Sequence, residues 1–196
     1  MLLYSITKST LHISTKDDEI EKIPENFFHD NFMNPRLRKS INEICISGKI
    51  SSVGKRAFKN ISGLRTIRLM PNVICSIASN AFSDNICLSN IQMNDNILSI
   101  GPSAFENCPT LRDIKFSQSL VIIGHRAFAN DESLIDIYIP HTLDFCDKTA
   151  FDGTNIDQDY FLQDMQRSIE CRNKSIETTN GGFHYLSVNK YKRGVN

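Results

Sequence analysis

The sequence predicts an α/β solenoid, and three observations support this prediction. The dipeptide Ala-Phe recurs at 57/58, 81/82, 104/105, 127/128 and 150/151. Its spacing is nearly constant, with steps of 24, 23, 23 and 23 residues. Apolar residues also recur at the same positions within each interval. Residues 111–128, for example, read L-x-x-I-x-F-x-x-S-L-x-x-I-G-x-x-A-F. Self-similarity at a fixed period of about 20–50 residues is typical of stacked coils.

Each coil begins with a predicted strand. Apolar residues occupy the fourth and sixth positions of five segments, which begin at Ile41, Leu64, Leu88, Leu111 and Leu134. This alternation with a period of two predicts a strand with one buried face. The third and fifth residues of each strand should therefore point outward.

The second half of each coil, which ends in the Ala-Phe pair, is predicted to form the turn side of the solenoid, where the chain returns toward the next strand. The phenylalanines predict a stacked spine of Phe58, Phe82, Phe105, Phe128 and Phe151. Replacing one central Phe with Ala should cost about 3–5 kcal/mol. Glycine suits a tight turn at Gly54, Gly101 and Gly124. The residues after each Phe are rich in Asn and Asp, as at 83–85 and 129–131, which predicts a short helical turn ending in a loop.

The chain divides into three predicted parts. Residues 1–19 form an N-terminal cap, in which Leu11-His12-Ile13 is either a short strand or part of a loose leader. Residues 20–151 form the solenoid. Residues 152–196 form a C-terminal cap and flexible tail: Tyr160, Phe161, Met165 and Ile169 have helical spacing, and Asn180-Gly181 signals a hairpin.

The first coil is longer than the others. Phe28 lies 30 residues before Phe58, so this coil carries about seven extra residues. Residues 29–40 hold them, and Pro35 with the basic residues Arg36, Arg38 and Lys39 predicts an exposed loop. This insertion either binds a partner or is idle surface.

Composition excludes several function classes. Acidic and basic residues number 22 each, which argues against a nucleic-acid binder. There is no run of 18 apolar residues, so no membrane span is expected. The first residues, MLLYSITKST, lack the basic region of a secretory signal peptide. The sequence therefore predicts a protein that is either cytoplasmic or displayed on a surface by a non-classical route.

No motif for catalysis or for cofactor binding is found. The five histidines have no metal-ligand spacing, and the glycines follow the repeat rather than a phosphate-binding loop. We expect no catalytic residues, no metal and no cofactor. The six cysteines are predicted to be reduced and mostly buried, since Cys146 stands where Ile100 and Ile123 stand in other coils.

The repeat resembles the BspA-type leucine-rich repeats, whose motif is close to L-x-x-I-x-I-P-x-x-L-x-x-I-G-x-x-A-F-x-x-C. The residues that match are Pro71, Pro140, Gly54, Gly101, Gly124, the five Ala-Phe pairs and Cys108. The resemblance covers about residues 20–151. It implies a leucine-rich-repeat right-handed superhelix of about six 23-residue coils with parallel strands. Members of this family are surface proteins of mucosal bacteria and protist parasites, and they are associated with adhesion.

The sequence predicts a non-catalytic protein-binding module that uses the outward strand face. The third positions are Glu43, Thr66, Asn90, Asp113 and Asp136, and the fifth positions are Cys45, Arg68, Gln92, Lys115 and Tyr138. Such columns extend roughly 20 Å. The resemblance implies adhesion or host-surface recognition through this face. The alternatives are an intracellular scaffold for a cytosolic protein partner, or a face that is simply solvated.

Overall fold

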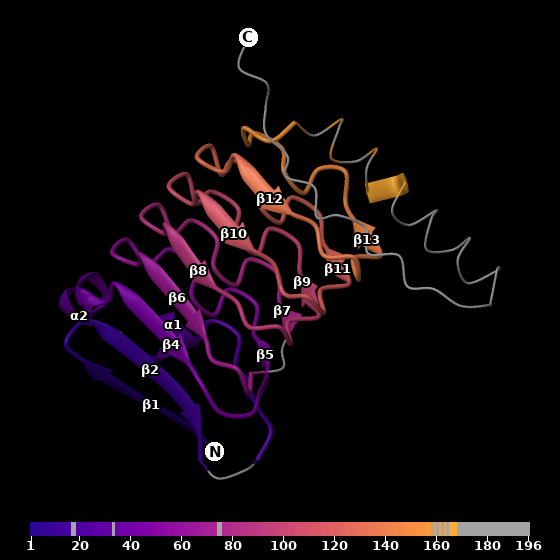
Figure 1. Cartoon of the computed structure of the whole chain (residues 1–196). Coiled ribbons are helices and arrows are strands. Elements are labelled where there is room, and N and C mark those ends of the chain that lie inside the picture. Colours follow the sequence, from indigo (N-terminus) through magenta and orange to yellow (C-terminus); the bar gives the residue numbers. More distant parts are fainter. Residues whose placement is uncertain are drawn as a thin grey trace.

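The computed structural model describes residues 1–16, 19–32, 34–73, 76–157, 159, 161, 163 and 165–167. The chain winds as a solenoid in which each coil contributes one strand to each of two sheets (Figure 1). The solenoid class predicted from the repeat is confirmed. The predicted hairpin around Asn180-Gly181 lies outside the described residues.

The first sheet, called sheet A here, has seven strands in the order β1-β2-β4-β6-β8-β10-β12. They are β1 (Leu2–Thr7), β2 (Thr10–Thr15), β4 (Glu43–Ile46), β6 (Thr66–Leu69), β8 (Asn90–Gln92), β10 (Asp113–Lys115) and β12 (Asp136–Tyr138). All pairs are parallel except that of β1 with β2. The strand that the Leu11–Ile13 alternation predicts is β2.

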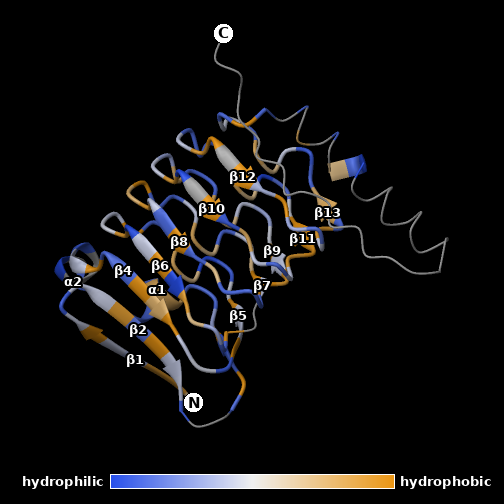
Figure 2. Cartoon of the chain, in the orientation of Figure 1, coloured by the Kyte–Doolittle hydropathy of each residue, from blue (hydrophilic) through white to orange (hydrophobic). Residues whose placement is uncertain are grey.

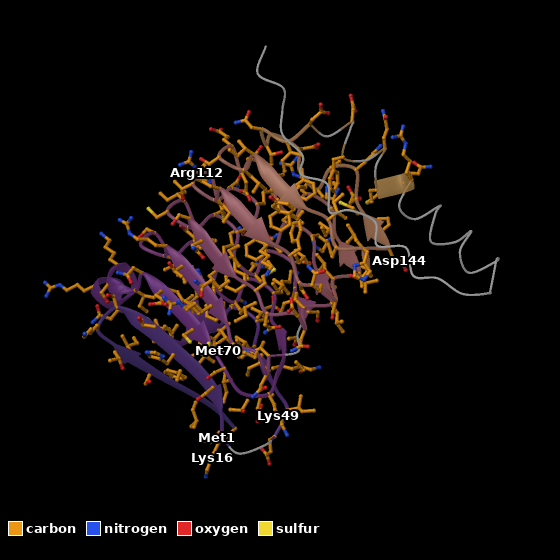
Figure 3. All side chains as sticks on the ribbon, in the orientation of Figure 1. Met1, Lys16, Lys49, Met70, Arg112 and Asp144 are labelled. Carbon is orange, nitrogen blue, oxygen red and sulfur yellow. The ribbon has the colours of Figure 1, made fainter. Side chains whose placement is uncertain are left out.

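The second sheet, called sheet B here, has six parallel strands in the order β13-β11-β9-β7-β5-β3. They are β3 (Glu21–Ile23), β5 (Ile50–Val53), β7 (Ser76–Ile77), β9 (Ser99–Ile100), β11 (Ile122–Ile123) and β13 (Phe145–Cys146). Apolar stripes alternate with polar ones along the strands of sheet A (Figure 2). Side chains fill the space between the two sheets (Figure 3).

The phenylalanine spine is confirmed. Rings from neighbouring coils, from Phe58 to Phe151, stack with centroids 5.3 to 5.4 Å apart and planes within 15°. Between coils, the N–H groups of the first four spine phenylalanines each donate to the carbonyl of an alanine in the next coil, as from Phe82 to Ala104 at 2.8 Å. Because the stack runs from coil to coil, the rings of its first and last coils would be exposed unless other residues covered them.

Aromatic residues cover both ends of the spine. At the first coil, Phe27 holds the position of alanine in later coils, and its ring packs edge-on against Phe58 at 5.8 Å. At the last coil, the ring of Phe161 packs edge-on against Phe151 at 5.0 Å. Phe161 is one of the residues whose helical spacing predicts a C-terminal cap, and residues 159, 161, 163 and 165–167 are helical. Tyr160 and Ile169 lie outside the described residues.

The insertion differs from the predicted exposed loop. It forms most of helix α1 (Phe27–Asn31) and all of α2 (Pro35–Ser40). Asn34 caps α2 because its side chain accepts a hydrogen bond from the N–H of Arg36 at 2.9 Å. Pro35 supplies the φ angle of a first helical residue. Phe32 is buried and stacks on Phe28 at 5.1 Å, so part of the insertion belongs to the core.

The repeat glycines Gly54, Gly101 and Gly124 serve close approach rather than a left-handed backbone. A Cβ added at Gly54 would lie 2.5 Å from the carbonyl oxygen of Ile23 in the preceding coil. The left-handed residues lie two positions later in the coil and carry side chains, as at Arg56 and Arg126. The tight spacing between coils therefore explains the recurrence of glycine at the start of this turn, which the Ala57 N–H closes by donating to the Gly54 carbonyl at 3.2 Å.

Candidate partner-binding surface

The outward face of sheet A holds the residues that the sequence predicts as a binding site. Strand register places the third positions in one column, in which Glu43 pairs with Thr66, Thr66 with Asn90, and Asn90 with Asp113. Asp136 follows next to Asp113. The backbone of all five residues is thus aligned as expected. The side chains of Asp113 and Asp136 lie outside what the structure describes.

The fifth positions form a second column beside the first. Cys45 pairs with Arg68, Arg68 with Gln92, and Lys115 with Tyr138. The side chains of Arg68, Gln92, Lys115 and Tyr138 are all exposed. Tyr138 keeps 41% of its surface accessible, and the side chain of Arg68 keeps 49%. This column therefore presents long cationic side chains and an aromatic ring to solvent.

Strand β2 extends both columns. The sequence repeat did not predict this alignment. Thr10 pairs with Glu43, and His12 pairs with Cys45. The 33-residue distance from Leu11 to Ile44 hides this strand from a search at a period of 23. The alternation in Leu11-His12-Ile13 was the only signal for it. We call the aligned residues other than the half-buried Cys45 the outward strand face: Thr10, His12, Glu43, Thr66, Arg68, Asn90, Gln92, Asp113, Lys115, Asp136 and Tyr138.

A polar network organises the N-terminal end of this face. The hydroxyl of Thr10 donates to Glu43 Oε2 at 3.0 Å. Arg68 Nε lies 2.7 Å from Glu43 Oε1 as an ion pair, although it is not aligned as a hydrogen bond. Partial burial, with the charge of Glu43, raises the pKa of the neighbouring Cys45 thiol, and Arg68 opposes this shift. The network therefore holds Arg68 in place and keeps Cys45 as a thiol.

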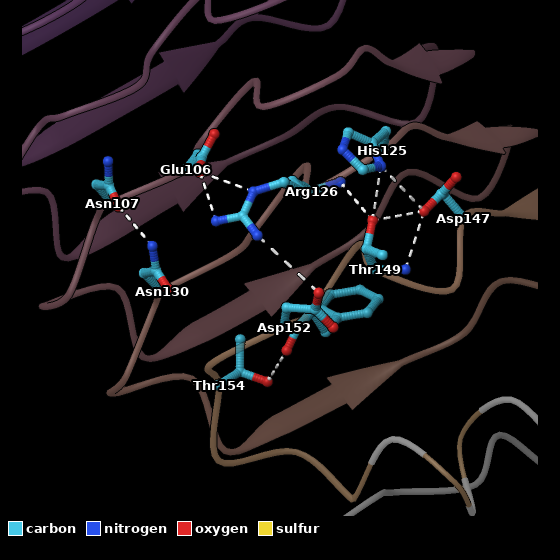
Figure 4. Close-up of polar contacts among 10 residues, drawn as sticks. Glu106, Asn107, His125, Arg126, Asn130, Asp147, Thr149, Asp152 and Thr154 are labelled. Carbon is cyan, nitrogen blue, oxygen red and sulfur yellow. Dashed lines mark hydrogen bonds and ion pairs between the residues drawn. The ribbon is translucent and has the colours of Figure 1, made fainter.

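A second group of polar contacts lies on the turn side of the last coils (Figure 4). Arg126 donates from Nε and Nη2 to Glu106 Oε1, at 2.9 and 2.7 Å, and its Nη1 lies 4.0 Å from Asp152. The side chain of Asn130 donates to that of Asn107 at 2.8 Å. Arg126, Glu106 and Asp152 come from three successive coils. These contacts link neighbouring coils, so their role is structural.

His125, Thr149 and Asp147 form a cluster with the residue types of a catalytic triad (Figure 4). The hydroxyl of Thr149 donates to Asp147 Oδ1 at 2.6 Å and lies 2.8 Å from His125 Nδ1. Asp147 Oδ1 lies 3.5 Å from the same ring nitrogen, His125 Nδ1. A triad needs the nucleophile and the acid on opposite ring nitrogens, with the hydroxyl proton given to histidine. Here the hydroxyl proton goes to Asp147, so Thr149 is not activated as a nucleophile.

Buried residues stand at the third position after each spine phenylalanine, and those that follow Ile61 form an inner column. We call Asn85, Cys108, Asp131 and Thr154 the inner turn column. Asn85 Oδ1 accepts from the N–H of Ile61 at 2.7 Å, and its Nδ2 donates to the carbonyls of Phe58 and Phe82 at 2.9 and 2.6 Å. Asn85 and Asp131 stand at the ends of the predicted helical turns at 83–85 and 129–131, and both are fully buried.

The cysteines that the structure describes carry free thiols. Cys108 and Cys146 are buried, and Cys45 and Cys87 are half-buried. Burial raises the pKa of the Cys146 thiol to about 12 and that of Cys108 well above its ordinary range. Cys146 pairs in register with Ile123, the position predicted for it. Cys75 and Cys171 lie outside the described residues.

Within the described ranges, no cluster of three or more His, Cys, Asp or Glu side chains could hold a metal ion. Among the helices of those same ranges, none is long and apolar enough to cross a membrane.

Parallel strands from successive coils of about 23 residues, packed on a stacked aromatic spine, define a leucine-rich-repeat solenoid. The model of the BspA type leucine rich repeat region matches six copies, over residues 4–70 and 21–157, and the chain belongs to this family. A search of curated proteins gave no match.

Solved structures with the same fold come from bacteria. A leucine-rich repeat protein from T. pallidum aligns with a TM-score of 0.55 at 20% identity, covering 78% of this chain and 64% of that one. A leucine-rich repeat protein from Eubacterium ventriosum aligns with a TM-score of 0.62 at 22% identity, covering 74% and 37%. This chain therefore matches less than two thirds of the length of either protein.

Proposed function

We propose that this chain is a non-catalytic module that binds a protein partner through the outward strand face. The supporting observation is the strand register, which aligns the face in two columns over six strands. Arg68 and Tyr138 stand exposed in one column, and arginine and tyrosine are enriched among the residues that anchor interfaces. Membership of a leucine-rich-repeat family agrees with binding as the role of this face.

The chemistry of the face suits a polar partner surface. His12, Arg68 and Lys115 lie in the fifth column, whereas Glu43, Asp113 and Asp136 lie in the third. A basic stripe thus runs beside an acidic one across the strands. Charged stripes favour a partner with the opposite arrangement and reject one shifted by a single column, so they contribute specificity and association rate more than affinity.

Adhesion or host-surface recognition is the role that the family favours. An intracellular scaffold is the second candidate, and the free thiols of Cys45 and Cys87 favour it because unpaired cysteines are common in reducing compartments. Protease treatment of intact cells of the native organism, followed by fractionation, separates the two. Loss of the protein to external protease supports adhesion, and protection supports the scaffold.

The strand face is tested by variants in a binding assay against a partner isolated by affinity pull-down. Arg68→Ala and Tyr138→Ala should each weaken binding about thirtyfold, as expected for an anchor of about 2 kcal/mol. Both should leave the melting temperature nearly unchanged, because exposed positions contribute little to folding. Phe145→Ala is the matched control, since Phe145 is an aromatic residue 52% exposed on sheet B.

The insertion provides the contrasting result. Arg36→Ala with Arg38→Ala removes two cations outside the outward strand face. If this double variant abolishes binding while Arg68→Ala and Tyr138→Ala do not, the binding site is the insertion rather than the strand face.

A further inference from the structure

The two sheets end in four edge strands, and three of these edges are protected. Strand β3 has three residues and a register shift between Glu21 and Lys22. Strand β12 also has three residues and is followed closely by Pro140. Strand β13 has two residues between Asp144 and Asp147. Short length, charge, proline and bulges are the features by which proteins prevent an edge from pairing with another chain.

Strand β1 has none of these features. It runs for six residues, LLYSIT, without a charge, a proline or a glycine. Its register with β2 is continuous from Leu2–Thr15 to Thr7–Thr10, so no bulge interrupts it. Within the part of the chain that the structure describes, β1 is the last strand of sheet A, and Figure 1 shows it at the outer end of the stack. An edge of this kind is open to another strand.

The backbone groups that β1 turns outward follow from its pairing. Lys16 N–H donates to Met1 O at 2.9 Å, which makes the Met1–Lys16 pair a hydrogen-bonded one. Because hydrogen-bonded and open pairs alternate in an antiparallel ladder, Leu3, Ser5 and Thr7 bond to β2. The N–H and C=O groups of Leu2, Tyr4 and Ile6 therefore point away from the sheet.

We propose that β1 pairs with β1 of a second copy of this chain, antiparallel, about a twofold axis at Tyr4. In this register Tyr4 faces Tyr4 of the partner copy, and Leu2 faces Ile6. All three outward-pointing residues of each copy then lie at hydrogen-bonded positions, so every free N–H and C=O of the edge finds a partner. No other register about a twofold axis pairs all six groups on each strand.

Side chains agree with this register. The Tyr4 ring packs edge-on against Phe27 and Phe32, both at 5.5 Å, and 48% of the residue remains exposed. Two such rings on facing residues, with Cα atoms about 5.5 Å apart, would cover each other. In this register Lys8 of one copy lies just beyond Met1 of the other copy. Glu19 and Glu21 pair with the Met1 amino group there, so Lys8 would approach two carboxylates. Sheet A would then continue through both copies and present two outward strand faces on one side.

A charge-swap experiment tests the pairing. Leu3 and Ser5 are exposed on the outward side of β1, and the proposed register places Leu3 of one copy opposite Ser5 of the other. Leu3→Lys with Ser5→Lys therefore sets lysines opposite lysines, and Leu3→Glu with Ser5→Glu does the same with glutamates. Each doubly substituted chain alone should dimerise at least about tenfold more weakly than the wild type. An equimolar mixture of the two should recover the wild-type dissociation constant.

Sedimentation equilibrium over a concentration series measures these constants, and circular dichroism confirms that each variant is folded. His12→Lys with Ser14→Lys is the matched control, because it adds the same charge to the same side of β2, one strand from the edge. It should change the dissociation constant less than about twofold. A monomeric wild type, a dimer that survives the two lysines on β1, or a folded mixture that fails to re-form the dimer would each overturn the proposal.

Discussion

Asn85 and Asp131 occupy the same position of the coil, two coils apart, and their surroundings differ in one respect. Both accept a hydrogen bond from a backbone N–H of the preceding coil, Asn85 from Ile61 and Asp131 from Cys108, each at 2.7 Å. The amide of Asn85 also donates to two carbonyl oxygens. The second oxygen of Asp131, Oδ2, is buried without a hydrogen-bond partner. In the coil of Asn85 the amide supplies both an acceptor and a donor to the backbone, whereas an ionised carboxylate at Asp131 supplies no donor.

A protonated Asp131 would resolve this difference. Burial, with the charge of Glu106 adding to it, raises the pKa of the Asp131 carboxyl to about 9, although the Cys108 N–H opposes the shift. The neutral acid has an O–H donor, and the carbonyls equivalent to those that Asn85 contacts are Phe105 and Phe128. We therefore expect Asp131 to keep its proton in the folded chain at neutral pH, which would let the coil accept an aspartic acid in place of asparagine. That proton is lost in the unfolded chain at neutral pH.

The largest effect that we predict comes from Asp131→Asn. The folded pKa lies above the unfolded value of 3.8, so Asp131 stabilises the fold fully below about pH 4 and loses this contribution as the pH rises to about 9. At pH 7 the loss approaches about 4 kcal/mol, at about 1.4 kcal/mol per pKa unit. Asp131→Asn should restore most of it. Urea unfolding of both chains at pH 5, 7 and 9 measures the difference between them.

The comparison with Asn85 supplies the control for that experiment. Asp84 and Asp147 have pKa values below the ordinary range. For Asp84, burial opposes the shift, but hydrogen bonds from Asn107 and Lys59 outweigh it. For Asp147, hydrogen bonds from Thr149 are the main cause. Their contributions rise with pH, but they are common to both chains and cancel in the difference. Asn85→Asp should add a second fall in stability over the same pH range. A difference between wild type and Asp131→Asn that does not change with pH would show that Asp131 is ionised in the fold.

The next largest effect is expected from Asn85→Ala. This change removes one acceptor and two N–H donors from a buried site. The Ile61 N–H and the Phe58 carbonyl lose this partner, and the Phe82 carbonyl keeps only the weak donor Cys108. The expected loss is about 3 kcal/mol in the free energy of unfolding. Asn96→Ala is the control, because Asn96 makes one exposed hydrogen bond, to Pro71 O at 2.6 Å. It should cost about 1 kcal/mol or less, and equal losses for the two variants would disprove the role of Asn85.

The repeat alone was enough to predict the solenoid, because a stacked fold places equal positions side by side. The spine from Phe58 to Phe151 and the two columns on sheet A follow from the 23-residue step. Strand β2 could not be found in this way, since α1 and α2 stretch the first coil beyond that step. Phe32 was missed for the same reason, because its burial depends on α1 rather than on the repeat.

The inner turn column shows a different limit of sequence reasoning. Asn85 and Asp131 stand in runs of Ser, Asp and Asn, which by composition are typical of surface loops. What buries them is the next coil, whose backbone needs partners at that depth. Polar residues at a fixed distance after the spine phenylalanine were the available signal, but Ile61 and Cys108 at the same position obscure it. The binding role of the outward strand face stays a prediction, because alignment of residues does not identify what they bind.

The smallest effect that we predict comes from Cys108, which lies between Asn85 and Asp131 in the inner turn column. Its thiol is a weak donor, 3.5 Å from the carbonyl of Phe82, one of the two carbonyls that the Asn85 amide contacts. Since Asn85 already satisfies that carbonyl, Cys108→Ala should cost only the lost packing of one sulfur, about 1 kcal/mol in urea unfolding. In Asn85→Ala the thiol becomes a remaining donor to Phe82, so adding Cys108→Ala should cost about 1 kcal/mol more than it does in the wild type. Strict additivity in this double-mutant cycle would mean that the two side chains act independently.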